Sequence, residues 1–186
     1  MADKKIIAVV GATGAQGGGL ARAILADPNG SFACRAITRD PNKDKAKDLT
    51  AKGAEVVMAD LDDVDTLKKA FAGAYGAYCV TNFWEHFSGE KEKAQAKNMA
   101  EAASTAGLKH VIWSTLEDTR KLMAATDTRM PILQEKYRVP HFDAMLSARA
   151  WNASGVRRAS TIAPGREPAL PRPESGGGDW MGGAAC

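Results

Sequence analysis

Apolar and polar positions form alternating blocks along the chain, in which short apolar runs precede stretches with helical spacing. The run Ile6–Val10 is bounded by charge and glycine, which is typical of a strand buried on both faces. Similar runs occupy residues 34–38, 54–58, 75–80 and 108–113. Helical spacing appears between them, over about 20–25, 43–52, 62–71 and 88–106. The pattern predicts five strands, each separated from the next by a helix.

Strands that alternate with helices favour an α/β fold with a parallel sheet, because parallel neighbours need crossover connections. Right-handed crossovers and a glycine-rich turn after the first strand indicate a doubly wound, Rossmann-type sheet with the strand order 3-2-1-4-5. The 186 residues are 45% hydrophobic and 25% charged, an ordinary globular composition. It excludes a wholly disordered chain and a disulfide-stapled mini-protein.

The composition changes near residue 144. Residues 1–144 contain 14 lysines, whereas residues 145–186 contain none and hold 7 glycines and 4 prolines. We therefore predict a Rossmann domain over 1–144 and a divergent, largely disordered tail over 145–186, with the C-terminal part of the fold missing. The tail is either a natural flexible segment or the product of a change of coding frame near Ala144.

Charge and cysteine content exclude several classes of partner. The net charge of +3 is too small to favour nucleic acid or an anionic membrane, and the lysine-rich stretch 91–97 is interleaved with acids as in a solvated helix face. Three cysteines without a CxxC pair, and three isolated histidines, predict neither a disulfide framework nor a metal site. No signal peptide is visible, so the cytoplasm or the nucleus is the expected compartment.

The glycine-rich turn carries the strongest chemical signal. Gly11, Gly14 and Gly17 follow a predicted strand and open a predicted helix, the context of a dinucleotide-binding fingerprint. These glycines permit a tight turn, close approach to a pyrophosphate and close helix packing, while the helix N-terminus offers free N–H groups. We expect the pyrophosphate to contact the whole turn: Gly11, Ala12, Thr13, Gly14, Ala15, Gln16 and Gly17. A glycine turn without a ligand is the plain structural alternative.

The end of the second strand indicates the coenzyme. Sites that prefer NAD place a carboxylate there for the ribose 2′-hydroxyl, whereas this chain has Arg39. An arginine pairs with a 2′-phosphate, and Arg35 and Lys43 are expected to add positive charge nearby. We predict NADP(H) rather than NAD(H); the alternative is an exposed arginine at a strand end.

Two further strand ends complete the predicted site. Asp60 follows the third strand and could accept from the adenine amino group, with the N–H of Leu61 facing the ring, although Asp60 could instead cap the next helix. Asp62 or Asp63 is expected to cap that helix. Asn82 and Phe83 follow the fourth strand and should lie near the nicotinamide half.

Six motifs, in this order, are similar to those of the NmrA-like family, an atypical branch of the short-chain dehydrogenases/reductases. They are Gly11–Gly17, Thr38–Arg39, Gly53–Val57, Asp60–Asp63, Val80–Glu85 and Ser114–Glu117, followed by Val139–Asp143. The resemblance covers about residues 4–144. It implies a Rossmann fold that binds NADP, with the Gly11–Gly17 turn on the pyrophosphate, Arg39 on the 2′-phosphate, Asp60 and Leu61 near the adenine, and Asn82 and Phe83 near the ribose and nicotinamide. Many members are redox-sensing regulators of a partner protein, and some reduce quinones or other carbonyl compounds.

The chain departs from the catalytic pattern. Active short-chain reductases carry a Tyr-x-x-x-Lys pair, and NmrA-like proteins usually show His-Phe-Asp-x-Lys there, whereas this chain has His141 and Met145. We therefore assign no catalytic residue and expect a sensor that regulates a partner protein, with an NAD(P)H-dependent oxidoreductase as the alternative. His141 is expected to be a turn residue after Pro140.

The missing C-terminal part has two expected consequences. The fifth strand should become an exposed sheet edge through which the chain could self-associate. Coenzyme binding should weaken and depend chiefly on the adenine and phosphate end.

Overall fold

One parallel sheet forms the centre of the molecule. The computed structural model describes residues 4–116, 118–122, 127, 129, 131–133, 137–144 and 159–162. The six strands stand in the order β3-β2-β1-β4-β5-β6. They are β1 (Lys5–Val10), β2 (Phe32–Thr38), β3 (Glu55–Met58), β4 (Gly76–Cys79), β5 (His110–Ser114) and β6 (Ala159–Ile162). The first five confirm the predicted doubly wound order 3-2-1-4-5.

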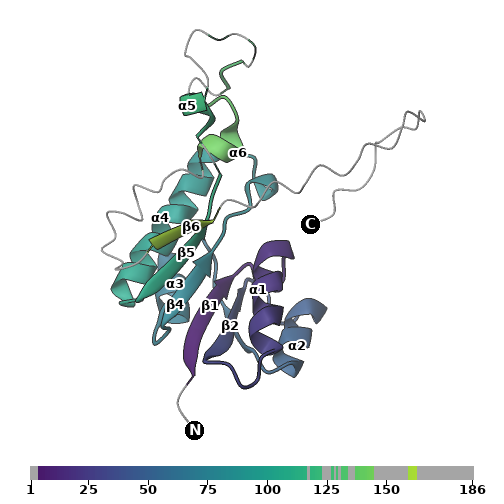
Figure 1. Cartoon of the computed structure of the whole chain (residues 1–186). Coiled ribbons are helices and arrows are strands. Elements are labelled where there is room, and N and C mark those ends of the chain that lie inside the picture. The colour runs from purple at the N-terminus through teal and green to yellow at the C-terminus, as the bar shows by residue number, and fades with distance from the viewer. Residues whose placement is uncertain are drawn as a thin grey trace, which may run out of the picture.

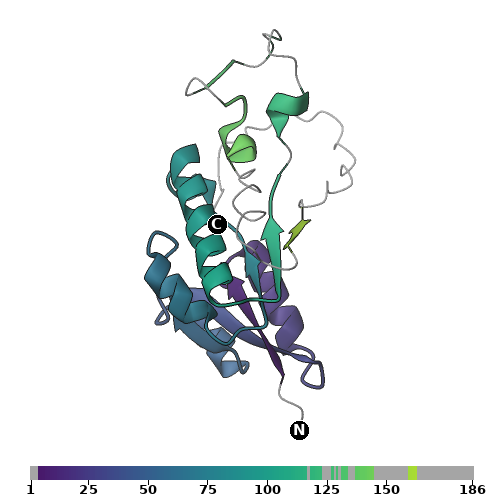
Figure 2. The same cartoon turned by 90° about the vertical axis from the view of Figure 1, so that its left-hand side faces the viewer.

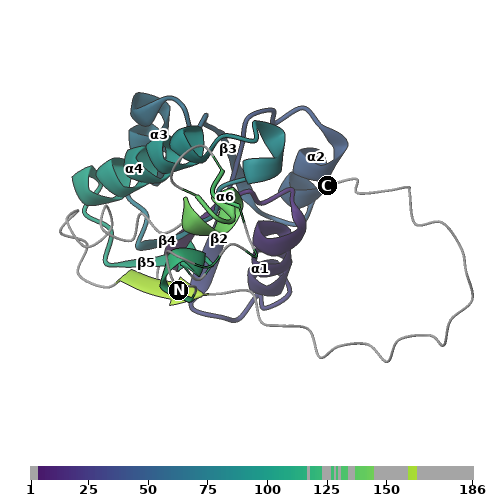
Figure 3. The same ribbon diagram turned by 90° about the horizontal axis from the view of Figure 1, so that it is seen from above.

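Helices cover both faces of the sheet (Figure 1). Helices α3 (Val64–Phe71) and α4 (Gly89–Thr105) lie side by side on one face, as the view from above shows (Figure 3). Helices α1 (Ala15–Leu25) and α2 (Asp44–Ala51) pack on the other face. None of the helices that the structure describes combines the length and apolar character needed to cross a membrane.

Two apolar clusters show why the strands have continuous apolar runs. Val9 belongs to the cluster beneath α1 and α2, whereas its neighbours Ala8 and Val10 belong to the cluster beneath α3 and α4. Successive side chains of a strand point to opposite faces, so a strand covered on both sides needs apolar residues at every position. The larger cluster contains the bulky side chains of Phe71 and Trp113, which are almost fully buried.

The expectation that β5 forms an exposed edge is wrong. Strand β6 pairs with β5 in parallel, from Val111 opposite Ala159 to Ser114 opposite Ile162. The backbone groups of β5 on that side are therefore paired, and the outer strands of the described sheet are β3 and β6. Strand β6 was not predicted, because it falls within the stretch expected to be a tail. The rest of that stretch, 145–158 and 163–186, lies outside the described residues.

Three short helical turns lie near the carboxyl ends of the strands. The 3-10 turn η1 (Phe83–Glu85) follows β4, and α5 (Thr119–Leu122) and α6 (Pro140–Asp143) lie beyond β5 (Figures 1 and 2). In a doubly wound sheet this end of the strands is where ligands bind. The predicted site residues all lie at this end, in loops or in the first turn of the helix that follows a loop.

Candidate functional site

The turn between β1 and α1 leaves little or no room for a side chain at its glycine positions. Gly11 has a φ of +66°, a left-handed conformation that favours glycine. A Cβ at Gly17 would lie 2.5 Å from the carbonyl oxygen of Gly11 and 2.6 Å from that of Val10. A Cβ at Gly14 would lie 3.2 Å from the same Gly11 oxygen, to which the Gly14 N–H donates at 2.9 Å. The backbone of the turn itself therefore favours glycine at positions 11 and 17, and leaves only a tight space at position 14.

The first turn of α1 presents unpaired backbone N–H groups. Its first internal hydrogen bond runs from the N–H of Gly18 to the carbonyl of Gly14, so the amides of Ala15, Gln16 and Gly17 have no partner within the helix. No side chain caps this end, and its first turn holds no acidic residue. Such an end attracts an anion, because the amides point outward and the helix dipole is positive there.

The side chain of Gln16 is hydrogen-bonded to two strands of the sheet. Its Oε1 accepts from the hydroxyl of Tyr78 on β4 at 2.8 Å and from Oγ of Ser114 on β5 at 2.7 Å. Burial raises the pKa of Tyr78, so this hydroxyl keeps its proton at neutral pH. Of the remaining predicted turn residues, Ala12 is buried in the core and Thr13 is half-buried. The turn thus offers backbone groups to a ligand more readily than side chains.

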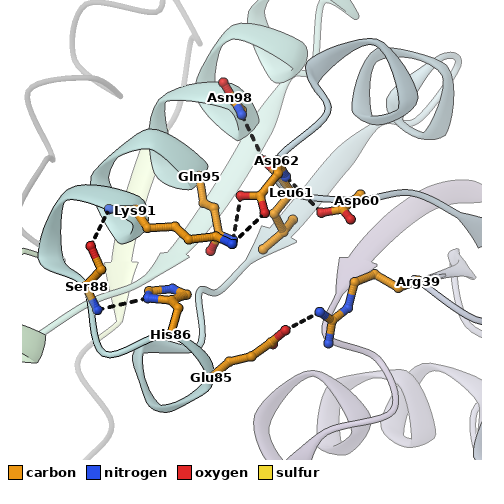
Figure 4. A network of polar contacts seen from close by, with 10 residues as sticks. All are labelled: Arg39, Asp60, Leu61, Asp62, Glu85, His86, Ser88, Lys91, Gln95 and Asn98. Carbon is orange, nitrogen blue, oxygen red and sulfur yellow. Dashed lines mark hydrogen bonds and ion pairs between the residues drawn. The ribbon is translucent and has the colours of Figure 1, made fainter.

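Arg39 pairs with a carboxylate that sequence reasoning did not identify. Its Nη1 donates to Oε1 of Glu85, which reaches across from η1 (Figure 4). The hydrogen bond to Glu85 raises the pKa of Arg39, and the nearby charges of Asp60 and Asp62 act in the same direction. The Arg39 side chain is 61% exposed, so most of this side chain faces solvent despite the ion pair.

Arg35, which was expected to add positive charge near Arg39, is engaged by other groups. Its guanidinium donates to the carbonyl oxygens of Ala70 at 3.0 Å and Ala72 at 2.6 Å, and to Oε2 of Glu55 at 2.8 Å. Arg35 lies in the middle of β2, directly opposite Glu55 on β3, and its side chain satisfies the last carbonyls of α3. Lys43, the N-cap residue of α2, is exposed.

The loop after β3 contains a cap and a tight turn. Asp63 caps α3, because its side chain accepts from the N–H groups of Asp65 and Thr66. Asp60 is therefore not the cap: its Oδ1 accepts from the N–H of Asp62 at 2.9 Å. This confirms capping by one of the two predicted aspartates and leaves Asp60 exposed at the end of β3.

Helix α4 fixes this loop from the side (Figure 4). The carboxylate of Asp62 accepts hydrogen bonds from Nζ of Lys91 and Nε2 of Gln95, each at 2.9 Å. The hydrogen bond from Lys91 lowers the pKa of Asp62. The carbonyl of Leu61 accepts from Nδ2 of Asn98 at 2.9 Å, and the Leu61 side chain packs against the core. These contacts hold the loop after β3 against α4.

Aromatic rings gather beyond β4. Phe83 is buried and lies 5.6 Å from His141 and 5.7 Å from Trp84, measured between ring centroids. Trp84 is 57% exposed and Phe87 is 62% exposed. Burial among these rings lowers the pKa of His141, which therefore favours its neutral form at neutral pH. Asn82, the N-cap residue of η1, is exposed beside them.

A buried carboxyl group contacts the segment that follows β4. Glu92 of α4 is fully buried, and its Oε1 accepts from Oγ1 of Thr81 at 2.7 Å. Its Oε2 has no hydrogen-bond partner among the described residues. Burial raises the pKa of Glu92 to about 7. Glu92 falls within the stretch 91–97, which was predicted to be a solvated face; this expectation is wrong at Glu92 and Gln95, both of which are buried.

Known proteins match most of this chain. The family model for the NmrA-like family matches residues 3–158. A curated relative from Cladobotryum sp, the NmrA-like family domain-containing oxidoreductase FrzB, is 37% identical over 147 residues. That match covers 77% of this chain and 43% of FrzB, so the chain spans less than half the length of that relative.

Solved structures extend the likeness to coenzyme complexes. The negative transcriptional regulator NmrA in complex with NADP is 26% identical, with a TM-score of 0.65 over 86% of this chain and 45% of that one. NmrA has also been solved with NAD. Triphenylmethane reductase of Citrobacter sp. complexed with NADP(H) is 25% identical, with a TM-score of 0.59 over 82% of this chain and 46% of that one.

Proposed function

The chain belongs to the NmrA-like family, and we propose that it binds NADP(H) as a redox-sensing regulator of a partner protein. The observation that carries this proposal is the close approach of Gly17 to the carbonyls of β1, which leaves room for backbone but not for a side chain. The Gly11–Gly17 turn leads into α1, whose first amides have no partner within the helix, and it lies at the same edge of the sheet as Arg39. NADP-bound structures of similar proteins support the choice of coenzyme.

The site residues divide into an adenine half and a nicotinamide half. In the first, the amides of Gly14–Gly17 would hold the pyrophosphate, Arg39 the 2′-phosphate, and Asp60 with the N–H of Leu61 the adenine. In the second, Asn82 and Phe83 would lie beside the ribose and nicotinamide. A bound coenzyme supplies hydride chemistry; the chain's own residues bind and orient it. We assign the coenzyme-binding unit to residues 1–144.

The regulatory role is favoured over efficient catalysis by the residues beyond β5. The family's lysine position holds Met145 in this chain, and His141 is packed among aromatic rings in a neutral state. Neither offers the proton donor and ribose contact of a Tyr-x-x-x-Lys pair. Oxidised and reduced coenzyme would then favour different arrangements of the loops after β4, which a partner protein, or a second copy pairing along an outer strand, would recognise. The cytoplasm or the nucleus is the compartment we assign.

The second candidate function is an NAD(P)H-dependent oxidoreductase. The exposed faces of Trp84 and Phe87, beside the expected nicotinamide position, could stack on a flat quinone or carbonyl substrate. The curated relatives are named as oxidoreductases, which also favours this candidate. Hydride transfer needs a positioned coenzyme and substrate, so turnover does not strictly require the Tyr-Lys pair.

Calorimetry and a turnover assay separate the two candidates. We expect saturable binding of NADPH to the full chain without steady consumption in the presence of quinones. Consumption well above background would favour the oxidoreductase. Binding of 2′,5′-ADP almost as tight as that of NADPH would show that the adenine half supplies most of the affinity. No heat with either NADPH or NADP on folded protein would refute both candidates.

A further inference from the structure

We propose that Glu85 narrows the preference of this site for NADP(H) over NAD(H) by competing with the 2′-phosphate for Arg39. The inference rests on the proposed function, since it concerns the same coenzyme site. Glu85 lies 46 positions further along the chain than Arg39 and reaches it from η1. The ion pair therefore joins the two halves of the site (Figure 4).

Glu85 is the carboxylate in contact with Arg39, and the neighbouring carboxylates are engaged elsewhere. Asp62 is held by Lys91 and Gln95, and Oδ1 of Asp60 turns toward the N–H of Asp62. Both act on Arg39 only through their more distant charge. Among the described residues, the direct competitor for this guanidinium is therefore Glu85.

In this arrangement Glu85 opposes the binding of a 2′-phosphate to Arg39. It carries a charge of about −1.5 to −2 at neutral pH and needs the same guanidinium that Glu85 occupies. Arg39 has further N–H donors, so the phosphate could bind while Glu85 stays, but the two anions would then repel each other. If Glu85 leaves instead, its ion pair is lost. Either way, Glu85 lowers the affinity for NADP(H).

The same carboxylate would accept a hydrogen bond from the free 2′-hydroxyl of NAD(H). NAD sites usually supply a carboxylate acceptor from the end of the second strand, where this chain has Arg39. Glu85 brings a carboxylate to the same place from the loop after β4. One side chain therefore disfavours the phosphorylated ribose and favours the free one.

The test compares Glu85→Gln with a matched control in the full chain. Glu101→Gln removes the same charge from another exposed ion pair, which joins Glu101 of α4 to Lys68 of α3. Dissociation constants for NADPH and NADH are measured by calorimetry at low salt, in the wild type and in both variants. The circular dichroism melting of each variant is compared with that of the wild type to confirm folding.

We expect Glu85→Gln to tighten NADPH binding about fivefold, in keeping with the modest strength of exposed ion pairs, and to leave NADH binding unchanged or weaker. Glu101→Gln should alter neither. In an Arg39→Ala background the Glu85→Gln effect should vanish, because the proposed competition acts through Arg39. An equal effect on both coenzymes, an equal effect of Glu101→Gln, or persistence in the Arg39→Ala background would overturn the inference. If the wild type binds neither coenzyme, the proposed function fails instead.

Discussion

Two glycines two positions apart in α1 should respond to alanine in opposite ways. Gly19 is exposed in the helix interior, and a Cβ there would meet nothing within 4 Å. Gly19→Ala should therefore raise the free energy of unfolding by about 0.5–1 kcal/mol, the usual gain in helix propensity and unfolded-state entropy. Gly17→Ala has the same intrinsic gain but faces three backbone atoms at 2.5–2.7 Å.

The backbone contacts decide the sign at Gly17. Carbonyl groups of β1 and the turn cannot rotate away as a flexible side chain could, so the strand end or the helix must move. Overpacking costs about 1–3 kcal/mol, and the short contacts with rigid backbone place Gly17→Ala in the upper part of that range, at about 2–3 kcal/mol. After the propensity gain is subtracted, a net loss of about 1–2 kcal/mol remains. The two variants should differ by about 2–3 kcal/mol, or about 5–10 °C in melting temperature.

Urea unfolding followed by circular dichroism measures both variants against the wild type, and NADPH titration follows the site. Gly17→Ala should also weaken NADPH binding, because it displaces the amides that face the pyrophosphate, whereas Gly19→Ala should not. A Gly17→Ala variant as stable as Gly19→Ala would refute the close approach. Unchanged NADPH binding in a destabilised Gly17→Ala variant would remove the turn from the coenzyme site.

Three further predictions follow from single contacts. Arg39→Ala should weaken NADPH binding about tenfold or more and NADH binding much less, as measured by calorimetry, because it removes a charge-assisted phosphate contact; equal losses would remove Arg39 from the 2′-phosphate site. Asp143→Asn should lower the free energy of unfolding by about 1–3 kcal/mol in urea titrations, because the carboxylate accepts from Thr119, Arg138 and Val139; an unchanged midpoint would contradict this. Glu92 has a pKa raised on folding from 4.5 to about 7, so the folded chain retains a proton that the unfolded chain releases. The stability of the wild type should therefore fall as the pH rises from about 4.5 to 7 and then level off, whereas that of Glu92→Gln should not show this fall; parallel pH profiles would refute the assignment.

The fold could be predicted because its signals are local. A strand buried on both faces must be apolar throughout, and Ile6–Val10 shows this in five residues without any knowledge of its neighbours. The turn at Gly11 is equally local, since the residues that clash with a Cβ at Gly17 lie only six and seven positions before it. Strand β6 could not be found in this way, because four residues within a stretch of altered composition carry too little pattern.

The site was less predictable, because its contacts join distant parts of the chain. Nothing around Arg39 in sequence indicates a partner 46 residues away, and only the parallel sheet brings η1 to the end of β2. Arg35 lies within β2 and Arg39 directly follows it, but the register places Arg35 opposite Glu55, away from the carboxyl ends of the strands. Charge near a motif in sequence is therefore a poor guide to charge near a ligand, whereas position within the strand is a better one.

In the segment Val139–Asp143, the residues of the family pattern make structural contacts. Asp143 accepts hydrogen bonds from Thr119 and from the backbone of Arg138 and Val139, and so ties α6 to the segment after β5. His141 packs against Trp84 with ring centroids 4.9 Å apart, which joins α6 to the loop after β4. The aspartate and histidine of the family's His-Phe-Asp-x-Lys pattern thus account for structure in this chain, while the position that would carry a ribose-binding lysine holds Met145. Under the proposed sensor function, these contacts would couple α6 to any change in the loop after β4 that the oxidation state of the coenzyme brings about.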